Sequence, residues 1–158
     1  MANHNVTISG GGKDLKYFGT LSSLNQDGLI ANNNYKRINL RMNTDANLNA
    51  WLQMRNEVSY ITSSQLTPGI STPKGIINKA LYMLPTLSAV KEIDGNWGYG
   101  KNGDNPTANA EASGSKTIDR PEILLNTTLI AKPVKDLEIL GQYSYRKTDA
   151  RATYITTP

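Results

Sequence analysis

The sequence contains no cysteine, a single histidine and no long apolar run. Without cysteine the chain forms no disulfide, no thiolate metal site and no cysteine nucleophile. His4 has no carboxylate or nucleophile beside it at a spacing that would fix a catalytic pair, so we interpret it as structural. The longest mainly apolar run, residues 75–85, is interrupted by Asn78 and Lys79 and is shorter than the roughly 18 residues of a membrane-spanning helix. These absences exclude a membrane-spanning helix, and they leave no group of catalytic residues that would support an enzyme function.

The positive charge of the chain is dispersed. The net charge is +4 with a pI near 9.3, but lysines and arginines stand singly or in pairs such as Lys36–Arg37 and Arg146–Lys147. Nucleic-acid-binding proteins gather such charge on one face, so we expect no nucleic-acid partner. The first ten residues contain no basic stretch followed by an apolar run, and we therefore expect no signal peptide in this chain.

Strict alternation of polar and apolar residues is the main positive signal. Along residues 35–43 one face carries Ile38, Leu40 and Met42, and the other carries Arg37, Asn39, Arg41 and Asn43. After a polar break at residues 44–49 the alternation resumes with Leu52, Met54 and Val58 on the apolar side. A period of two residues is typical of a strand with one buried face, so these segments predict two long antiparallel strands around a short turn.

Further strand patterns divide the chain into two blocks of strands with a long loop between them. The first block covers residues 1–63, with strands at 4–11 and 15–25 before the pair above, and the second covers residues 120–158, with strands at 121–131 and 137–146 and a short one at 152–156. Residues 64–119 are irregular and rich in proline and glycine, apart from one or two helical turns at 75–83. A loop of this length between clear strands indicates a functional loop.

The pattern fits two all-β folds. Short turns at 12–15, 45–50 and 132–137 alternate with longer loops at 25–34 and 64–119, as in an outer-membrane barrel of antiparallel up-and-down strands. Aromatic residues also lie near strand ends, where such barrels place their interfacial girdles: Tyr17, Tyr35, Trp51, Tyr60 and Tyr145. Six or seven strands are fewer than the roughly eight of the smallest closed barrel. The fold is therefore part of a larger transmembrane barrel with one long, partly helical extracellular loop, or a small soluble β-sandwich that binds through the 64–119 loop.

The two folds differ in what covers the apolar face. The residues in question are Ile38, Leu40, Met42, Leu52, Met54, Leu125, Leu129, Ile139 and Tyr143. In a barrel segment they form one continuous outward belt facing lipid, whereas in a sandwich they face each other across a core about 10 Å thick. A third reading, a hydrolase, lacks paired carboxylates at a defined spacing.

Several long segments resemble the barrel region of SusC/RagA-type TonB-linked outer-membrane transporters. They are HNVTISGG (4–11), NQDGLI (25–30), YKRINLRMNTDANLNAWLQMRNEVSY (35–60), NKALYMLPTLSAVKEIDGNWG (78–98) and LLNTTLIAKPVKDLEILGQYSY (124–145). The resemblance implies import of a large nutrient, often a glycan, through a plugged barrel of about 22 strands. It also implies an outer-membrane location, energy from a TonB complex and a SusD-type surface lipoprotein as partner. This chain resembles an internal segment, with the plug and the remaining strands outside it.

The long loop carries the residues that we expect to contact a nutrient. Gly10–Gly12 lacks the lysine and helix of a phosphate-binding loop, and the oxygen-rich segment 94–105 lacks the terminal glutamate of an EF-hand, so we expect neither a phosphate site nor a metal or other cofactor. Aromatic rings stack on sugar rings, and neighbouring amides and carboxylates bind hydroxyls. The predicted substrate-binding residues are Tyr82, Asp94, Asn96, Trp97, Tyr99 and Asn102. The alternative is that these residues pack the loop on itself or against the partner.

Overall fold

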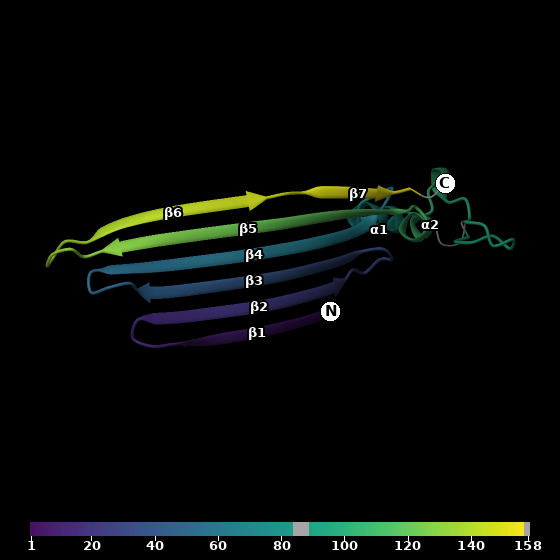
Figure 1. Ribbon diagram of the computed structural model, residues 1–158. Coiled ribbons are helices and arrows are strands. Elements are labelled where there is room, and N and C mark those ends of the chain that lie inside the picture. The colour runs from purple at the N-terminus through teal and green to yellow at the C-terminus, as the bar shows by residue number, and fades with distance from the viewer. Residues whose placement is uncertain (84–88, 157–158) are drawn as a thin grey trace. The chain divides into compact units, whose positions relative to one another are not determined.

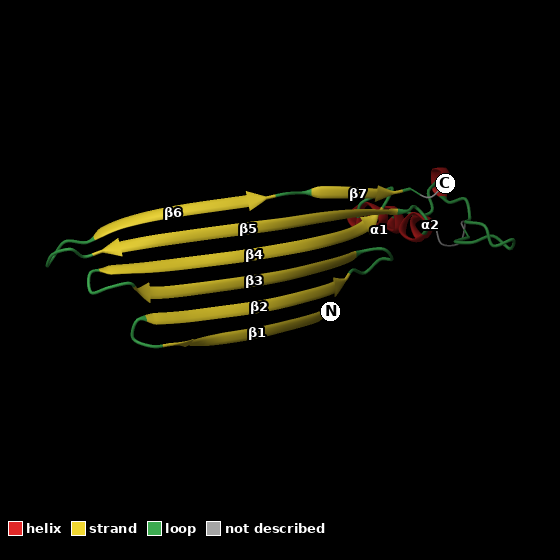
Figure 2. Ribbon diagram, in the orientation of Figure 1, coloured by secondary structure: helices red, strands yellow, loops and turns green. Residues whose placement is uncertain are grey.

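A computed structural model of the chain describes residues 1–83 and 89–156 (Figure 1). In chain order the elements are β1 (Ala2–Gly11), β2 (Leu15–Asp27), β3 (Asn34–Asn47), β4 (Leu52–Pro68), α1 (Pro73–Leu81), the 3-10 turn η1 (Lys101–Gly103), α2 (Pro106–Glu111), β5 (Ser115–Ala131), β6 (Ile139–Thr148) and β7 (Arg151–Ile155). Strands dominate, and the helices lie between β4 and β5 in the chain (Figure 2). No helix in these described ranges is long and apolar enough to cross a membrane.

The chain divides into two compact units. We call residues 1–25, 36–63 and 119–150 the sheet unit, and residues 26–35, 64–118 and 151–158 the loop unit. Strands β2 to β5 contribute residues to both units.

The strands pair in the order in which they follow one another. β1 to β6 form one sheet in chain order, and β7 pairs with β5 (Figure 1). β1 and β2 are antiparallel with a register that runs from Ala2 opposite Asn25 to Gly11 opposite Lys16. β5 and β6 are antiparallel from Glu122 opposite Thr148 to Ala131 opposite Ile139. The predicted antiparallel up-and-down fold is confirmed.

Tight turns join the strands within the sheet unit. Between β1 and β2 the Gly12 N–H donates to the Leu15 carbonyl at 2.7 Å, and between β3 and β4 the Leu48 N–H donates to the Leu52 carbonyl at 2.9 Å. Gly11 lies so close to the backbone of Leu15 and Lys16 that a Cβ atom there would overlap it, so the first turn requires glycine. Turns of this length fix the register, because a shift by one residue would move every side chain to the opposite face.

The sheet unit has a polar face and an exposed apolar face. Ile38, Leu40 and Met42 of β3 remain about half exposed, at 47%, 49% and 50%. Among the described residues of this unit, Ile130 is the one buried hydrophobic side chain. The predicted belt therefore does not pack across a protein core. The soluble β-sandwich is wrong, because the sheet unit contains one layer of strands and no second sheet to cover its apolar face.

A polar row of three residues crosses the apolar face. The Thr127 hydroxyl donates to the Asn56 side-chain oxygen at 3.0 Å, and the Asn56 amide donates to the Thr44 hydroxyl at 3.5 Å. Thr44 alternates in phase with Met42, and Thr127 in phase with Leu129, so the row belongs to the apolar side. Because these side chains satisfy one another, they tolerate an environment without water better than isolated polar groups would.

The strands extend further into the central segment than the sequence pattern indicates. β4 continues to Pro68 and β5 begins at Ser115, whereas the pattern ends the strands at 63 and resumes them at 120. The Gly69 N–H donates to the Gly114 carbonyl at 3.2 Å, so backbone pairing persists where side-chain alternation has stopped. Residues 84–88 of the predicted loop lie outside the described residues.

Local capping signals start both helices of the loop unit. The Thr72 hydroxyl accepts from the Gly75 N–H at 3.1 Å, and Pro73 occupies the first turn of α1, where its missing N–H costs nothing. This helix confirms the helical turns predicted at 75–83. Asn105 caps α2, which the sequence pattern did not predict, and Pro106 again follows the cap. Ile76 and Ala110, one from each helix, are the buried hydrophobic residues of the described part of this unit.

Candidate functional site

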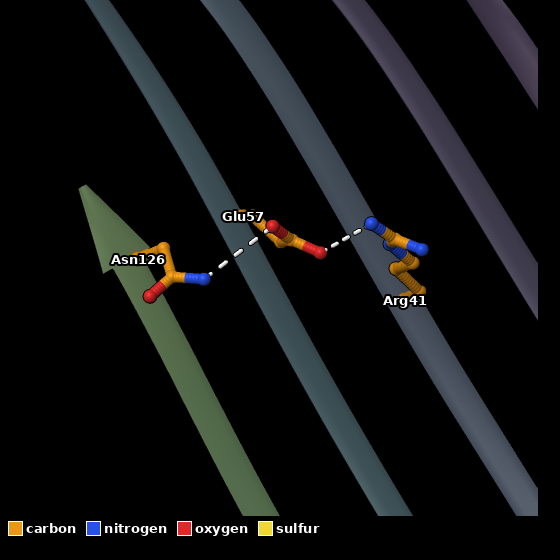
Figure 3. A network of polar contacts seen from close by, with 3 residues as sticks. All are labelled: Arg41, Glu57 and Asn126. Carbon is orange, nitrogen blue, oxygen red and sulfur yellow. Dashed lines mark hydrogen bonds and ion pairs between the residues drawn. The ribbon is translucent and has the colours of Figure 1, made fainter. Parts of the chain in front are cut away.

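A ladder of polar contacts crosses four strands on the polar face of the sheet unit. The Arg41 guanidinium of β3 pairs with the Glu57 carboxylate of β4, and the Asn126 amide of β5 donates to the other Glu57 oxygen at 3.4 Å (Figure 3). The Ser144 hydroxyl of β6 donates to the Asn126 side-chain oxygen at 2.6 Å. Each side chain is held by its neighbour on the next strand, so the ladder fixes the orientation of charged groups along this face.

A shallow polar concavity adjoins this ladder. Its volume is about 450 Å³, and it is lined by both cationic and anionic side chains together with amides and hydroxyls. Within it Arg55 pairs with Asp45, their Nε and Oδ1 atoms being 3.2 Å apart. Its charged residues are Lys16, Asp45, Arg55 and Glu57, two of each sign. The balance of charge makes this wall hydrophilic without a strong preference for ligands of one sign.

A hairpin in the loop unit holds three of the predicted binding residues. Lys91 and Trp97 form a β-bridge, and the Gly95 N–H closes the turn on the Glu92 carbonyl at 3.0 Å. The Asn96 backbone N–H and its side-chain amide both donate to the Asp94 carboxylate, and these two bonds lower the pKa of Asp94. The Lys91 ammonium lies 4.5 Å from the centroid of the Trp97 ring. The face of Trp97 is therefore in contact with a cation of the same hairpin.

Asn105 ties this hairpin to α2. Its side chain is buried, and its amide donates to the Val90 and Gly98 carbonyls, each at 2.9 Å. Its side-chain oxygen accepts from the Thr107 and Ala108 N–H groups at 3.2 Å. One side chain thus satisfies four backbone groups from two segments, which orders the loop around the candidate binding residues.

A small pocket forms where the end of α1 meets the segment before α2. Its volume is about 270 Å³, and its lining residues are Lys79, Tyr82, Met83, Asn102 and Asp104. Lys79 donates to Asp104 at 2.6 Å. The hydrogen bond from Lys79, with a smaller contribution from Asn109, lowers the pKa of Asp104. Asn102 has a φ of 57°, in the left-handed region that asparagine tolerates better than most residues.

The predicted binding residues do not form one cluster in the described loop. Tyr82 and Asn102 share the pocket, whereas Asp94, Asn96 and Trp97 belong to the hairpin. Tyr99 is 84% exposed, and its ring lies against Gly103. Ligand contact by these residues remains a prediction. Lys79 and Asp104 were not predicted, because their 25-residue separation gives no sign in the sequence that a helix end and a turn meet.

Comparisons with known proteins identify a structural counterpart. No family model matches the sequence, and no curated protein matches it. The chain does match the solved structure of the RagAB peptide importer in its closed-closed state, with a TM-score of 0.76 and 16% sequence identity. The match covers 99% of this chain and 18% of that one, so the chain corresponds to less than a fifth of the importer chain it resembles.

This match agrees with the resemblance found in the sequence segments and with the order of strands in the sheet. Identity at this level speaks to the fold rather than to the ligand. The described chain accordingly shares its fold, an antiparallel up-and-down sheet, with a segment of that importer.

Proposed function

We propose that this chain is a segment of a TonB-dependent nutrient importer of the outer membrane. Residues 1–63 and 120–158 supply barrel strands, and residues 64–119 form a loop on the extracellular side. The observation that carries the proposal is the two-faced sheet, whose apolar side chains lie exposed on one face while the charged ladder occupies the other. Barrels in membranes need this arrangement, because lipid contacts one face of each strand and the lumen the other.

Lipid explains the apolar face better than water does. Monomeric soluble proteins rarely expose contiguous apolar patches of more than a few hundred Å². Here exposed apolar side chains recur on neighbouring strands, among them Val6 and Ile8 of β1, Leu21 of β2 and Leu40 and Met42 of β3. A wide apolar surface of this kind is stable where hydrocarbon replaces water.

The loop is proposed to meet the nutrient and a SusD-type surface lipoprotein. Its aromatic and amide side chains suit a glycan, with contacts from Tyr82, Asp94, Asn96, Trp97, Tyr99 and Asn102. Exposed apolar residues of the loop unit, including Ile70, Leu81 and Ile93, offer area for a protein partner. No residue is assigned a catalytic role.

Single-cysteine labelling tests the membrane assignment, and the cysteine-free sequence makes it direct. Six variants place one cysteine in turn at residues 38 to 43 of β3, each labelled with an environment-sensitive fluorophore after the chain is inserted into phosphatidylcholine vesicles. We expect a lipid-bound nitroxide to quench labels at Ile38, Leu40 and Met42, and aqueous iodide to quench those at Asn39, Arg41 and Asn43. Quenching without a period of two residues would contradict the proposal.

A further inference from the structure

The pocket between the end of α1 and the segment before α2 has the groups to distinguish ligands by charge. Its volume of about 270 Å³ lies below the roughly 300–1,000 Å³ of pockets for drug-sized ligands, so it suits one ring of an oligomer rather than a whole ligand. Tyr82 is 76% exposed, which leaves its ring available to a ligand. Asn102 offers both a donor and an acceptor.

The ion pair between Lys79 and Asp104 determines which ligands fit. The ammonium has three N–H donors, and the carboxylate has about four acceptor positions, so their 2.6 Å contact leaves donors and acceptors on both groups for a ligand. A hydroxyl can donate to Asp104 and accept from Lys79 without breaking the pair. A charged ligand group would have to displace one partner or lie beside a charge of its own sign.

We infer that Lys79, Tyr82, Asn102 and Asp104 form a subsite for one uncharged sugar ring and reject charged rings. The inference rests on the proposed import function, and it narrows the substrate to neutral glycans at this position. The ion pair balances the charge of the pocket, so the site offers no net electrostatic attraction to uronic acids, amino sugars or peptide termini. Loss of either partner would leave one unbalanced charge and reverse that selectivity.

Calorimetric titration of the whole chain in a zwitterionic detergent without sugar headgroups tests this inference. The probes are neutral hexamers (maltohexaose, cellohexaose and xylohexaose), anionic hexagalacturonate, a cationic hexamer of glucosamine, and trialanine, which carries the charged termini of a peptide. We expect at least one neutral hexamer to bind about tenfold more tightly than either charged one. Tyr82→Ala should lower that affinity about tenfold. Leu81→Ala is the control and should leave the affinity unchanged, because Leu81 is the preceding residue and is equally exposed, at 76%.

Two charge variants are each expected to gain affinity for one charged hexamer. Misfolding cannot imitate this result, because a misfolded chain loses affinity. Asp104→Asn leaves Lys79 unpaired and should raise the affinity for hexagalacturonate about tenfold. Lys79→Met leaves Asp104 unpaired and should raise the affinity for the glucosamine hexamer by a similar factor. Glu111→Gln, which changes an exposed carboxylate of α2 outside the pocket, is the control and should change neither.

The outcomes separate this inference from the import proposal. Equal or tighter binding of a charged hexamer or of trialanine by the unmodified chain overturns the neutral-sugar subsite. Binding that ignores Tyr82→Ala and both charge variants overturns it as well, and so does a chain that binds no hexamer although its β3 labels alternate between lipid and water. If the labels do not alternate, the import proposal fails whatever the titrations show.

Discussion

The sheet unit and the loop unit are stabilised in different ways. In the sheet unit the apolar side chains stay exposed on one face, and regular pairing and cross-strand contacts hold the strands in register. In the loop unit the helices bury Ile76 and Ala110 and a few polar anchors such as Asn105 and Ser113. The sheet therefore depends on the medium around it, whereas the loop depends on specific internal hydrogen bonds.

The largest expected effect comes from placing a charge on the apolar face. Leu129→Arg should destabilise the detergent- or lipid-bound chain by about 2–4 kcal/mol, because a guanidinium near the middle of a bilayer loses its hydration. Thr128→Arg is the matched control, since Thr128, the residue next to Leu129 in the chain, lines the polar concavity with Asp45 and Glu57. Urea titrations followed by tryptophan fluorescence measure both. Equal losses for the two variants would show that the faces do not differ.

Next in size is the removal of the polar anchor of the loop. Asn105→Ala should destabilise the loop unit by about 2–3 kcal/mol, because it leaves buried backbone groups without partners and removes a helix cap. Hydrogen exchange should show faster exchange at Ala108 and Gly98 while the β1–β2 amides stay protected. Protection lost equally in both units would mean that the two units do not unfold independently.

Asn56→Ala sharpens the same contrast from the sheet side. The Asn56 side chain bonds to Thr44 and Thr127 on the apolar face, and its backbone belongs to strand β4, which the substitution leaves in place. We expect a loss of about 1 kcal/mol, measured by the same urea titration. A loss as large as that of Asn105→Ala would indicate that side-chain hydrogen bonds matter as much in the sheet as in the loop.

The smallest expected effect concerns acid. The pKa of Asp104 is lowered from its ordinary value of 3.8 by the Lys79 contact, so the ion pair contributes its full stabilisation above that value. This contribution is lost as the pH falls from 3.8 through the lower folded-state pKa. Titration of the Asp104 carboxyl by carbon NMR should show the midpoint below 3.8, and Lys79→Met should move it upward. A midpoint that Lys79→Met leaves in place would contradict a bond between the two groups.

The regular part of the fold could be predicted from the sequence, and the loop could not. Alternation at Ile38, Leu40 and Met42 predicted β3, because a period of two residues identifies a strand and shows which of its side chains share one face. The same alternation could not show what covers the apolar face, and a soluble sandwich stayed possible until the sheet was seen as a single layer. The strand ends at Pro68 and Ser115 were missed because backbone pairing continues there without a side-chain pattern.

The candidate site was predicted only in part, for a physical reason. Tyr82 and Asn102 were proposed on residue type, and the structure brings them to one pocket. Lys79 and Asp104 meet because the end of α1 lies beside the segment before α2. This is a tertiary contact, which leaves no pattern in the sequence. Asp94, Asn96 and Trp97 were grouped with them by closeness in sequence, but a hairpin turn places them together in a structure of their own.

The paired glycines at the ends of β4 and β5 bear on how such a chain can evolve. Gly69 and Gly114 are hydrogen-bonded, and a Cβ atom on either would overlap neighbouring backbone, on Ser113 and Ile155 respectively. The chain thus leaves and rejoins the strand pairing at a fixed pair of positions, whatever lies between them. Doubling the length of a flexible loop costs only about 0.6 kcal/mol in closure entropy. Segments of different length and sequence could therefore replace residues 70–113 while the strands on either side keep their register.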